Sequence, residues 1–309
     1  MPENFECAII GGGPAGLTAA VYLARFHRSV VLFDAGGGRA ASIPRSHNVP
    51  GYPEGVTGPE LLAAMAKHAR HYGADLRSGA VETLEPVGKA WRLRGEGIDV
   101  AARAVLIATG VENLHPDIPA AVHAAALAAG QLRYCPVCDG HEAAGPERTV
   151  RIGVLGAKSH GVAEALFLRH FTPNVTLFTH ETCELHEKDR AELARTGTGW
   201  DPRPVTRYDF GGKGVTLHFA DGEAARIDTL YSALGTRPHT ALVAQLGLVL
   251  DDEDCVLADR HQRLGLRGLY GAGDVVAALD QIAVAMGHAA VAATAMHNDL
   301  RDADGETLD

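Results

Sequence analysis

The sequence predicts an α/β fold, because short apolar strands alternate with helical segments that begin at glycine-rich turns. One such strand–turn–helix unit begins near residue 6, and a second begins near residue 150. A third short strand, Leu269–Asp274, precedes an alanine-rich helix from about residue 281. The chain has 309 residues, which is long for one hydrophobic core, so we expect two domains.

The composition excludes several classes of protein. The net charge is −10 and no basic block occurs, so neither a nucleic acid nor an anionic membrane is an expected partner. No apolar run reaches the roughly 20 residues that a membrane span requires. The chain shows no secretory leader, so we expect a cytoplasmic, reducing location. There, five cysteines indicate catalysis, metal binding or core packing rather than a disulfide scaffold.

The first strand–turn–helix unit has the pattern of a dinucleotide-binding site. The apolar run Glu6–Ile10 predicts a buried parallel strand, and Leu17–Arg25 predicts a helix. The turn between them fits GxGxxG, whose glycines let the backbone approach a pyrophosphate at the helix N-terminus. A second strand, Ser29–Phe33, ends at Asp34, where an acid can bind ribose hydroxyls. The candidate phosphate-binding residues are Gly11, Gly13, Pro14, Ala15 and Gly16.

Two distant segments favour FAD over NAD in this first site. Ala104–Gly110 is an apolar strand that ends in Ala-Thr-Gly, and Leu269–Asp274 ends in Gly-Ala-Gly-Asp. Both resemble the accessory motifs of flavoproteins with two dinucleotide-binding domains. The resemblance implies that the aspartate contacts the ribityl–pyrophosphate region and that the next helix points its N-terminus at the flavin ring. It adds these candidate FAD-binding residues: Thr109, Gly110, Gly273, Asp274, Gln281 and Ile282.

A CxxC motif, Cys135-Pro-Val-Cys138, followed by Asp139, indicates thiol chemistry. Such a pair can close to a disulfide and reopen, and the carboxylate after it can carry the proton that the exchange moves. A helix dipole and the nearby His141 can both stabilise a thiolate. The same spacing also provides half of a zinc site. Because no second CxxC is present, we expect a redox pair and no metal.

With these motifs in this order, nearly the whole sequence resembles the low-molecular-weight thioredoxin reductases, in class II of the pyridine nucleotide–disulfide oxidoreductase family. The resemblance implies two Rossmann-like, three-layer dinucleotide-binding domains, the second inserted into the first. It assigns residues 1–112 and 242–309 to an FAD-binding domain, and residues 113–241 to a central NAD(P)H-binding-like domain that carries the dithiol. It also implies a homodimer, with a thioredoxin-like protein or a small dithiol or disulfide as substrate.

The resemblance also implies a role for each residue of the redox site. Cys138 exchanges electrons with the flavin, Cys135 attacks the external disulfide or thiol, and Asp139 is the acid or base. Asn48 lies in Asn-Val-Pro-Gly, at the place of a family turn over the flavin, and is a candidate flavin contact. Residues 36–43 lack the family's Gly-Gly-Gln signature and contain Gly-Gly-Gly-Arg39 instead, so local flavin contacts are expected to differ.

The second strand–turn–helix unit departs from the family's NADPH site in two places. Its turn runs from Gly156 to Gly161, and Lys158 replaces the middle glycine of GxGxxG, which obstructs the approach of a pyrophosphate. After the next strand, His180 and Glu181 stand where the family has arginines that bind the 2′-phosphate. A carboxylate repels that phosphate, and no bidentate donor replaces the arginines. We therefore expect inefficient use of NADPH.

Three functions follow from these observations. The first is an FAD-dependent thiol–disulfide oxidoreductase, working as a dithiol oxidase or with an electron partner other than a nicotinamide, such as ferredoxin or oxygen. The second is an NADPH-dependent thioredoxin-disulfide reductase that tolerates its altered site. The third is a non-enzymatic, flavin-bound redox sensor. Asp139 argues against the sensor, because a switch has less need of a proton carrier.

Overall fold

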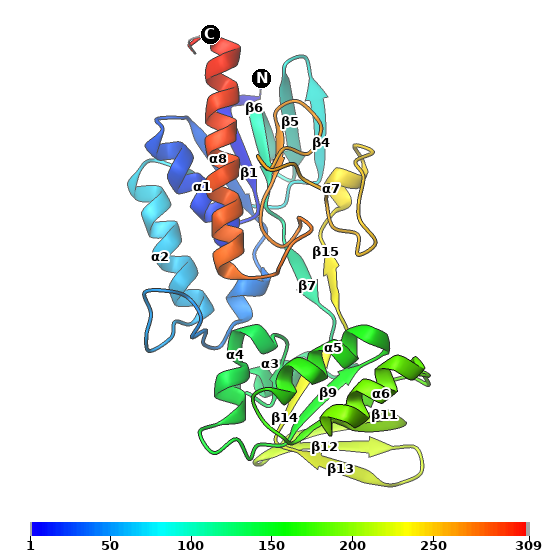
Figure 1. Ribbon diagram of the computed structural model, residues 1–309. Helices are drawn as coiled ribbons and strands as arrows, with labels where there is room; N and C mark the ends of the chain where they lie inside the picture. The colour runs from blue at the N-terminus through cyan, green and yellow to red at the C-terminus, as the bar shows by residue number, and fades with distance from the viewer. Residues whose placement is uncertain (1, 307–309) are drawn as a thin grey trace. The chain divides into compact units, whose positions relative to one another are not determined.

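The computed structural model describes residues 2–306, and its chain divides into two compact units (Figure 1). The first unit contains the described residues up to Arg45, then Val49–Glu112 and the segment from Arg237 onward. The second unit contains Ser46–Asn48 and Asn113–Thr236. The chain leaves the first unit through β7 (Val111–Asn113) and returns through β15 (Thr236–Pro238), and these two strands pair with each other.

The first unit is built on a seven-stranded sheet in the order β3-β2-β1-β6-β5-β4, with β16 also paired to β6. Its strands around β1 are parallel, while β4 and β5 form an antiparallel extension beside β6. The strand bounds are β1 Glu3–Ile10, β2 Val30–Asp34, β3 Asp75–Ser78, β4 Thr83–Val87, β5 Ala90–Gly95, β6 Ile98–Ile107 and β16 Leu269–Gly271.

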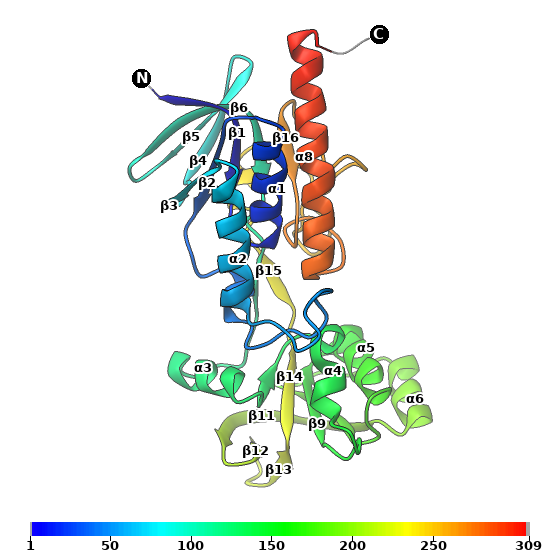
Figure 2. The same cartoon turned by 90° about the vertical axis from the view of Figure 1, so that its left-hand side faces the viewer.

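Helices α1 (Pro14–Arg25), α2 (Gly58–His71) and α8 (Ile282–Asp304) lie side by side in the first unit (Figure 2). The small side chains of α8 allow it to pack closely on α1, and Ala289 and Met296 of α8 are fully buried in this core. A second core lies among the other strand residues, around Leu93 and Ile107. Two short helical segments, η1 Arg39–Ser42 and α7 Ala241–Ala244, complete the unit.

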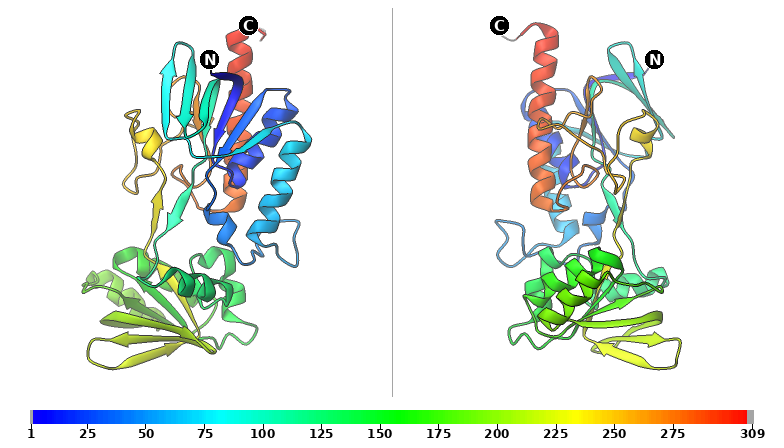
Figure 3. Two further views of the ribbon diagram at one scale, coloured as in Figure 1. Left: turned by 180° about the vertical axis from the view of Figure 1, so that it is seen from behind. Right: turned by 45° about the vertical axis from the view of Figure 1, so that its right-hand side comes forward.

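The second unit has its own seven-stranded sheet, in the order β13-β12-β11-β10-β9-β14-β8 (Figure 3). The strands from β8 to the first part of β11 are parallel, and β11, β12 and β13 continue as an antiparallel meander. The strand bounds are β8 Leu132–Arg133, β9 Ile152–Gly156, β10 Val175–Thr179, β11 Gly199–Gly211, β12 Gly214–Phe219, β13 Ala224–Ile227 and β14 Thr229–Ala233.

The helices of the second unit pack against two faces of this sheet. Residues of α4 (Pro136–Ala144), α5 (Lys158–Arg169) and α6 (Glu187–Thr196) share one hydrophobic core with β9 and β10. Helix α3 (Ala120–Ala128) contributes to a separate core with Leu155, Phe178 and the meander. The structure therefore confirms the predicted α/β fold with two dinucleotide-binding-type units.

The close packing of α8 on α1 can be tested at Ala289, which is fully buried between them. Ala289→Leu adds volume to a filled core, so we expect a loss of about 1–3 kcal/mol of stability. That loss lowers the thermal midpoint of unfolding by about 2–4 °C for each kcal/mol. Val291→Leu is the matched control, because Val291 lies on the same helix and is 41% exposed. An equal effect of both substitutions on the melting temperature would contradict the packing described.

Candidate functional site

The first glycine turn leaves space for a ligand at its middle position. A Cβ built on Gly11 lies 2.2 Å from the Ala108 carbonyl oxygen, and one built on Gly16 lies 1.9 Å from the Gly11 carbonyl oxygen. These two glycines are required by packing alone. A Cβ on Gly13 meets no heavy atom of the described chain within 4 Å. Gly13 therefore has no packing role, and the open space before it suits a pyrophosphate.

The start of α1 is also suited to an anion. The helix begins at Pro14 after Gly13, without a side-chain cap and without an acidic residue in its first turn. Its first N–H groups and the positive end of its dipole are thus available to a phosphate. Asp34, at the end of β2, lies beside the turn and accepts hydrogen bonds from the Gly12 and Gly36 amides at 3.2 and 3.3 Å. This is the place expected for the acid that binds ribose hydroxyls.

Gly273 brings the distant motifs of the first unit together. A Cβ on Gly273 lies 2.9 Å from the Ala15 Cβ and 3.7 Å from the Ala285 Cβ. The Gly-Ala-Gly-Asp segment therefore passes between the first turns of α1 and α8. Helix α8 begins at Ile282 after Gln281 and has no acidic residue in its first turn. Two uncharged helix starts thus flank the segment that carries Asp274.

An ion-pair cluster that the sequence analysis missed surrounds Asp274. Nη1 of Arg39 donates to Oδ2 of Asp274 at 3.3 Å and to Oδ2 of Asp280 at 2.7 Å. Burial and, to a smaller extent, the charge of Asp280 raise the pKa of Asp274, Arg39 partly offsets both, and the resulting pKa is about 6. Arg39 lies in residues 36–43, where the family's Gly-Gly-Gln signature is missing. This difference from the family was the sequence feature that could have indicated the ion-pair cluster.

The predicted residues Thr109 and Gly110 hold the returning chain of the first unit. The Thr109 hydroxyl donates to the His239 carbonyl at 2.8 Å, and the Gly110 carbonyl accepts from the His239 amide at 2.9 Å. Asn48 belongs to the short segment that groups with the second unit, and its side-chain amide donates to the Val137 carbonyl at 3.4 Å. The flavin contacts of Thr109, Gly110 and Asn48 remain predictions.

The two cysteines of the CxxC motif form a disulfide at the start of α4. Cys135 is the residue that precedes the helix, and its Sγ accepts a hydrogen bond from the Cys138 amide at 3.1 Å. The amide and the positive end of the helix would both stabilise a thiolate at Cys135 after reduction. His141 follows Cys138 by three residues on the same helix and is exposed, and its role remains a prediction.

Asp139 is held by two residues that sequence reasoning did not identify. Nη1 of Arg133 donates to its Oδ2 at 2.5 Å, and the Tyr231 hydroxyl donates to its Oδ1 at 2.7 Å. Arg133 on β8 and Tyr231 on β14 are register partners in parallel strands, so the sheet presents them together to the first turn of α4. Burial, followed by the charge of Asp139, raises the pKa of the fully buried Tyr231 above its ordinary value, so this hydroxyl stays a donor.

The second glycine turn keeps the packing glycines and lacks the open one. A Cβ on Gly156 lies 2.8 Å from the Gly161 Cα, and one on Gly161 lies 3.0 Å from the Gly156 carbonyl carbon. The middle position is Lys158, whose φ of 57° is a conformation that favours glycine. At the end of β10, Thr179 is fully buried and its hydroxyl donates to the Glu181 carbonyl at 2.7 Å. A threonine thus replaces the acid found at the corresponding strand end of the first unit.

Within residues 2–306, no group of three His, Cys, Asp or Glu side chains could hold a metal ion. None of the helices in that range combines the length and the apolar character needed to cross a membrane.

Two cysteines outside the CxxC motif are unreactive. Burial raises the pKa of the Cys7 thiol to about 12 and that of the Cys255 thiol to about 11, so neither forms a thiolate readily.

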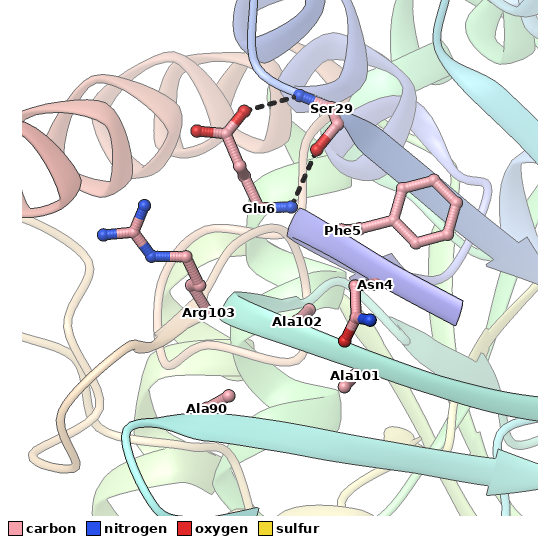
Figure 4. A pocket seen from close by; sticks show the side chains of 8 residues that line it. All are labelled: Asn4, Phe5, Glu6, Ser29, Ala90, Ala101, Ala102 and Arg103. Carbon is pink, nitrogen blue, oxygen red and sulfur yellow. Dashed lines mark hydrogen bonds between the residues drawn. The ribbon is translucent and has the colours of Figure 1, made fainter. Parts of the chain in front are cut away.

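In a surface pocket of about 350 Å³ in the first unit, the charged side chains are already paired within the protein (Figure 4). Its lining includes Glu6, which accepts from Arg28 and from the Ser29 amide, and Arg103, which pairs with Asp304. Figure 4 shows the exchange of hydrogen bonds between Glu6 and Ser29. We therefore assign no function to this pocket.

Comparison with known proteins supports the same interpretation. The family described as pyridine nucleotide-disulphide oxidoreductase matches residues 5–289. A thioredoxin reductase of Mycolicibacterium smegmatis is 32% identical over 88% of this chain and 88% of its own length. The crystal structure of HlmI has a TM-score of 0.89 at 28% identity and covers 98% of this chain and 94% of its own. The thioredoxin reductase of Streptococcus pyogenes MGAS5005 has a TM-score of 0.87 at 26% identity, covering 98% of this chain and 100% of its own.

These matches extend over both units and confirm the resemblance inferred from the motifs. They support an FAD-dependent enzyme that acts on a sulfur group, with the two-domain dinucleotide-binding fold seen in the solved structures. The open turn at Gly13 fits the flavin nucleotide that such an enzyme requires. The chain therefore belongs to the pyridine nucleotide-disulphide oxidoreductase family, as a thioredoxin reductase-like flavoprotein.

Proposed function

We propose that this enzyme passes electrons between FAD and an external dithiol or disulfide through Cys135 and Cys138, without efficient use of NADPH. The observation that carries this proposal is the contrast between the two glycine turns. The middle position is open at Gly13 and is occupied by Lys158 in the second unit. A chain with an intact flavin turn and an altered nicotinamide turn needs another electron partner, such as oxygen or ferredoxin.

The residues of the first unit would hold FAD. The turn from Gly11 to Gly16 and the start of α1 would bind the pyrophosphate, and Asp34 would bind ribose hydroxyls. Asp274, which Arg39 keeps in place, and the start of α8 would bind the rest of the cofactor. When bound, FAD supplies two-electron redox chemistry to the dithiol.

Thiol–disulfide exchange between the substrate and the cysteine pair requires no other reactant. In the oxidising direction, a substrate thiolate attacks Sγ of Cys135, the Cys135–Cys138 bond breaks, and Cys138 leaves as a thiolate. The second substrate thiol then attacks the mixed disulfide and releases Cys135. The substrate leaves as a disulfide, and two electrons and two protons remain on the cysteine pair. Reduction of an external disulfide is the same sequence in reverse, begun by the Cys135 thiolate.

Asp139 is the residue that we assign to proton transfer in these steps. It lies in the first turn of α4, next to Cys138, and both of its oxygens accept hydrogen bonds. An oxygen that accepts from Arg133 or Tyr231 is held in a defined orientation, as proton transfer to or from a thiol requires. The proton-carrying role also favours an enzyme over a redox sensor.

The second candidate function is an NADPH-dependent thioredoxin-disulfide reductase. This candidate is favoured by the similarity of the chain to the thioredoxin reductase of Mycolicibacterium smegmatis. Under either function, a thioredoxin-like protein or a small dithiol is the proposed substrate, and a homodimer is the proposed assembly.

The electron partner can be identified by anaerobic rapid mixing of the FAD-loaded protein. We expect a dithiol such as dithiothreitol to bleach the flavin absorbance quickly, because it can reduce the Cys135–Cys138 disulfide. We expect NADPH to bleach it at least about a hundredfold more slowly, since the second turn lacks its ligands. Rapid bleaching by NADPH would refute the proposed function and establish the second candidate.

The two cysteines should have different roles when each is replaced by serine. Both Cys135→Ser and Cys138→Ser should lower turnover at least about a thousandfold, as loss of a covalent catalyst does. Cys138→Ser keeps the external nucleophile, so we expect mass spectrometry to detect a mixed disulfide between Cys135 and the substrate. Cys183→Ser, at a half-buried cysteine outside the motif, is the control. Unchanged turnover in both motif variants would exclude the dithiol mechanism.

The proton-transfer role of Asp139 predicts a specific loss in Asp139→Asn. The amide keeps the shape of the side chain and cannot carry the proton, so we expect kcat to fall about a hundredfold at unchanged flavin content. Glu142→Gln removes a charge from an exposed position of the same helix and should leave kcat unchanged. Equal kcat values for the two variants in steady-state assays would show that Asp139 carries no proton.

A further inference from the structure

The start of α5, in the second unit, is already occupied by a carboxylate from a neighbouring helix. Asp189 of α6 is 8% exposed, and its Oδ2 accepts a hydrogen bond from the Ser159 hydroxyl at 3.0 Å. Ser159 is the second residue of α5, so this buried carboxylate lies at the first turn of that helix. Asp189 itself lies in the first turn of α6. Its charge is therefore close to the positive ends of two helices.

The position of this carboxylate has a physical cause. Helix α5 begins after Ala157 without a side-chain cap and has no acidic residue in its own first turn. Its first N–H groups and its dipole attract an anion. A buried carboxylate is stable where hydrogen-bond donors and a positive potential compensate for its lost hydration. The Ser159 hydroxyl supplies one such donor to Asp189, and the dipole of α5 supplies the positive potential.

In a dinucleotide-binding unit, this helix start is the site of the pyrophosphate. The first unit differs from the second at this helix start. Its acid, Asp34, accepts a hydrogen bond from the Gly12 amide, and the first turn of α1 contains no acidic residue. In the second unit, a pyrophosphate at this helix start would approach the buried carboxylate of Asp189, whose negative charge has the same sign. Like charges at such distances repel strongly where water is excluded.

We infer that Asp189 occupies the anion position of the second glycine turn and, with Lys158, excludes the pyrophosphate of pyridine dinucleotides. This inference rests on the proposed function and extends it from NADPH to NADH, because a pyrophosphate is common to both. The missing arginines explain only the loss of the 2′-phosphate contacts. The carboxylate at α5 would also exclude a nicotinamide donor that lacks this phosphate.

The experiment is a calorimetric titration of the FAD-loaded, oxidised protein with NAD⁺ and NADP⁺, which measures binding without turnover. We expect no saturation of the wild type in the millimolar range. Asp189→Asn keeps the shape of the side chain and removes its charge, so we expect at least about a tenfold gain in NAD⁺ affinity. The double variant Asp189→Asn with Lys158→Gly should gain at least about a hundredfold.

Two control variants test whether the negative charge of Asp189 itself, and no other charge on α6 or hydrogen bond to Asp189, prevents dinucleotide binding. Glu192→Gln removes a charge from the same helix at a side chain that is 44% exposed, so we expect no gain in affinity. Ser159→Ala breaks the hydrogen bond but leaves the carboxylate, so it too should gain nothing. Thermal melting of each variant verifies that it is folded, and Asp189→Ser replaces Asp189→Asn if the amide variant is unstable.

The outcomes are distinguishable from those that test the proposed function. Micromolar binding of NAD⁺ to the wild type, or Asp189 variants that bind no better than Glu192→Gln, would overturn the inference. Neither result affects the bleaching of the flavin by dithiols, which tests the sulfur chemistry. Conversely, if dithiols fail to bleach the flavin, a gain of dinucleotide affinity in Asp189→Asn still identifies the residue that closes the second turn.

Discussion

The structure of both units depends on one contact, in which the first turn of a helix packs backbone to backbone against the end of the preceding strand. In the first unit, Gly16 lies directly on Gly11, and in the second unit Gly161 lies on Gly156. No side chain fits between these pairs, so the glycines are required wherever this strand–turn–helix arrangement is kept. The contact aims the helix N-terminus at the carboxyl edge of the sheet, which is where a dinucleotide can bind.

The same contact explains how the second unit can keep its fold although the middle residue of its turn differs from that of the first unit. Packing requires the outer glycines of the turn, but it does not require the middle one, since a Cβ on Gly13 meets no other part of the described chain. A substitution at the middle position therefore affects nucleotide binding far more than folding. Lys158 occupies that position in the second unit, and the buried carboxylate of Asp189 accepts a hydrogen bond from Ser159 in the first turn of the helix. Sheet, helix and dithiol remain in place.

The fold could be predicted from the sequence because its signals are local. The apolar run before Gly11, the helix after it, and the motif ending at Asp274 each reveal themselves within about ten residues, and the structure confirms the fold class they indicate. The CxxC motif is equally local, and its cysteines are bonded to each other. The partners of the motif residues are not local. Tyr231 is 92 positions from Asp139, and Arg39 is 235 from Asp274.

The sequence by itself thus determined the class of fold, the thiol chemistry and the altered residues of the second turn, because each follows from residue types at short spacing. The tertiary structure decided which side chains surround that chemistry. Strand register brings Arg133 and Tyr231 to Asp139, and helix packing brings Asp189 to the start of α5. Register and packing result from burying apolar surface over the whole unit, so no local motif encodes them.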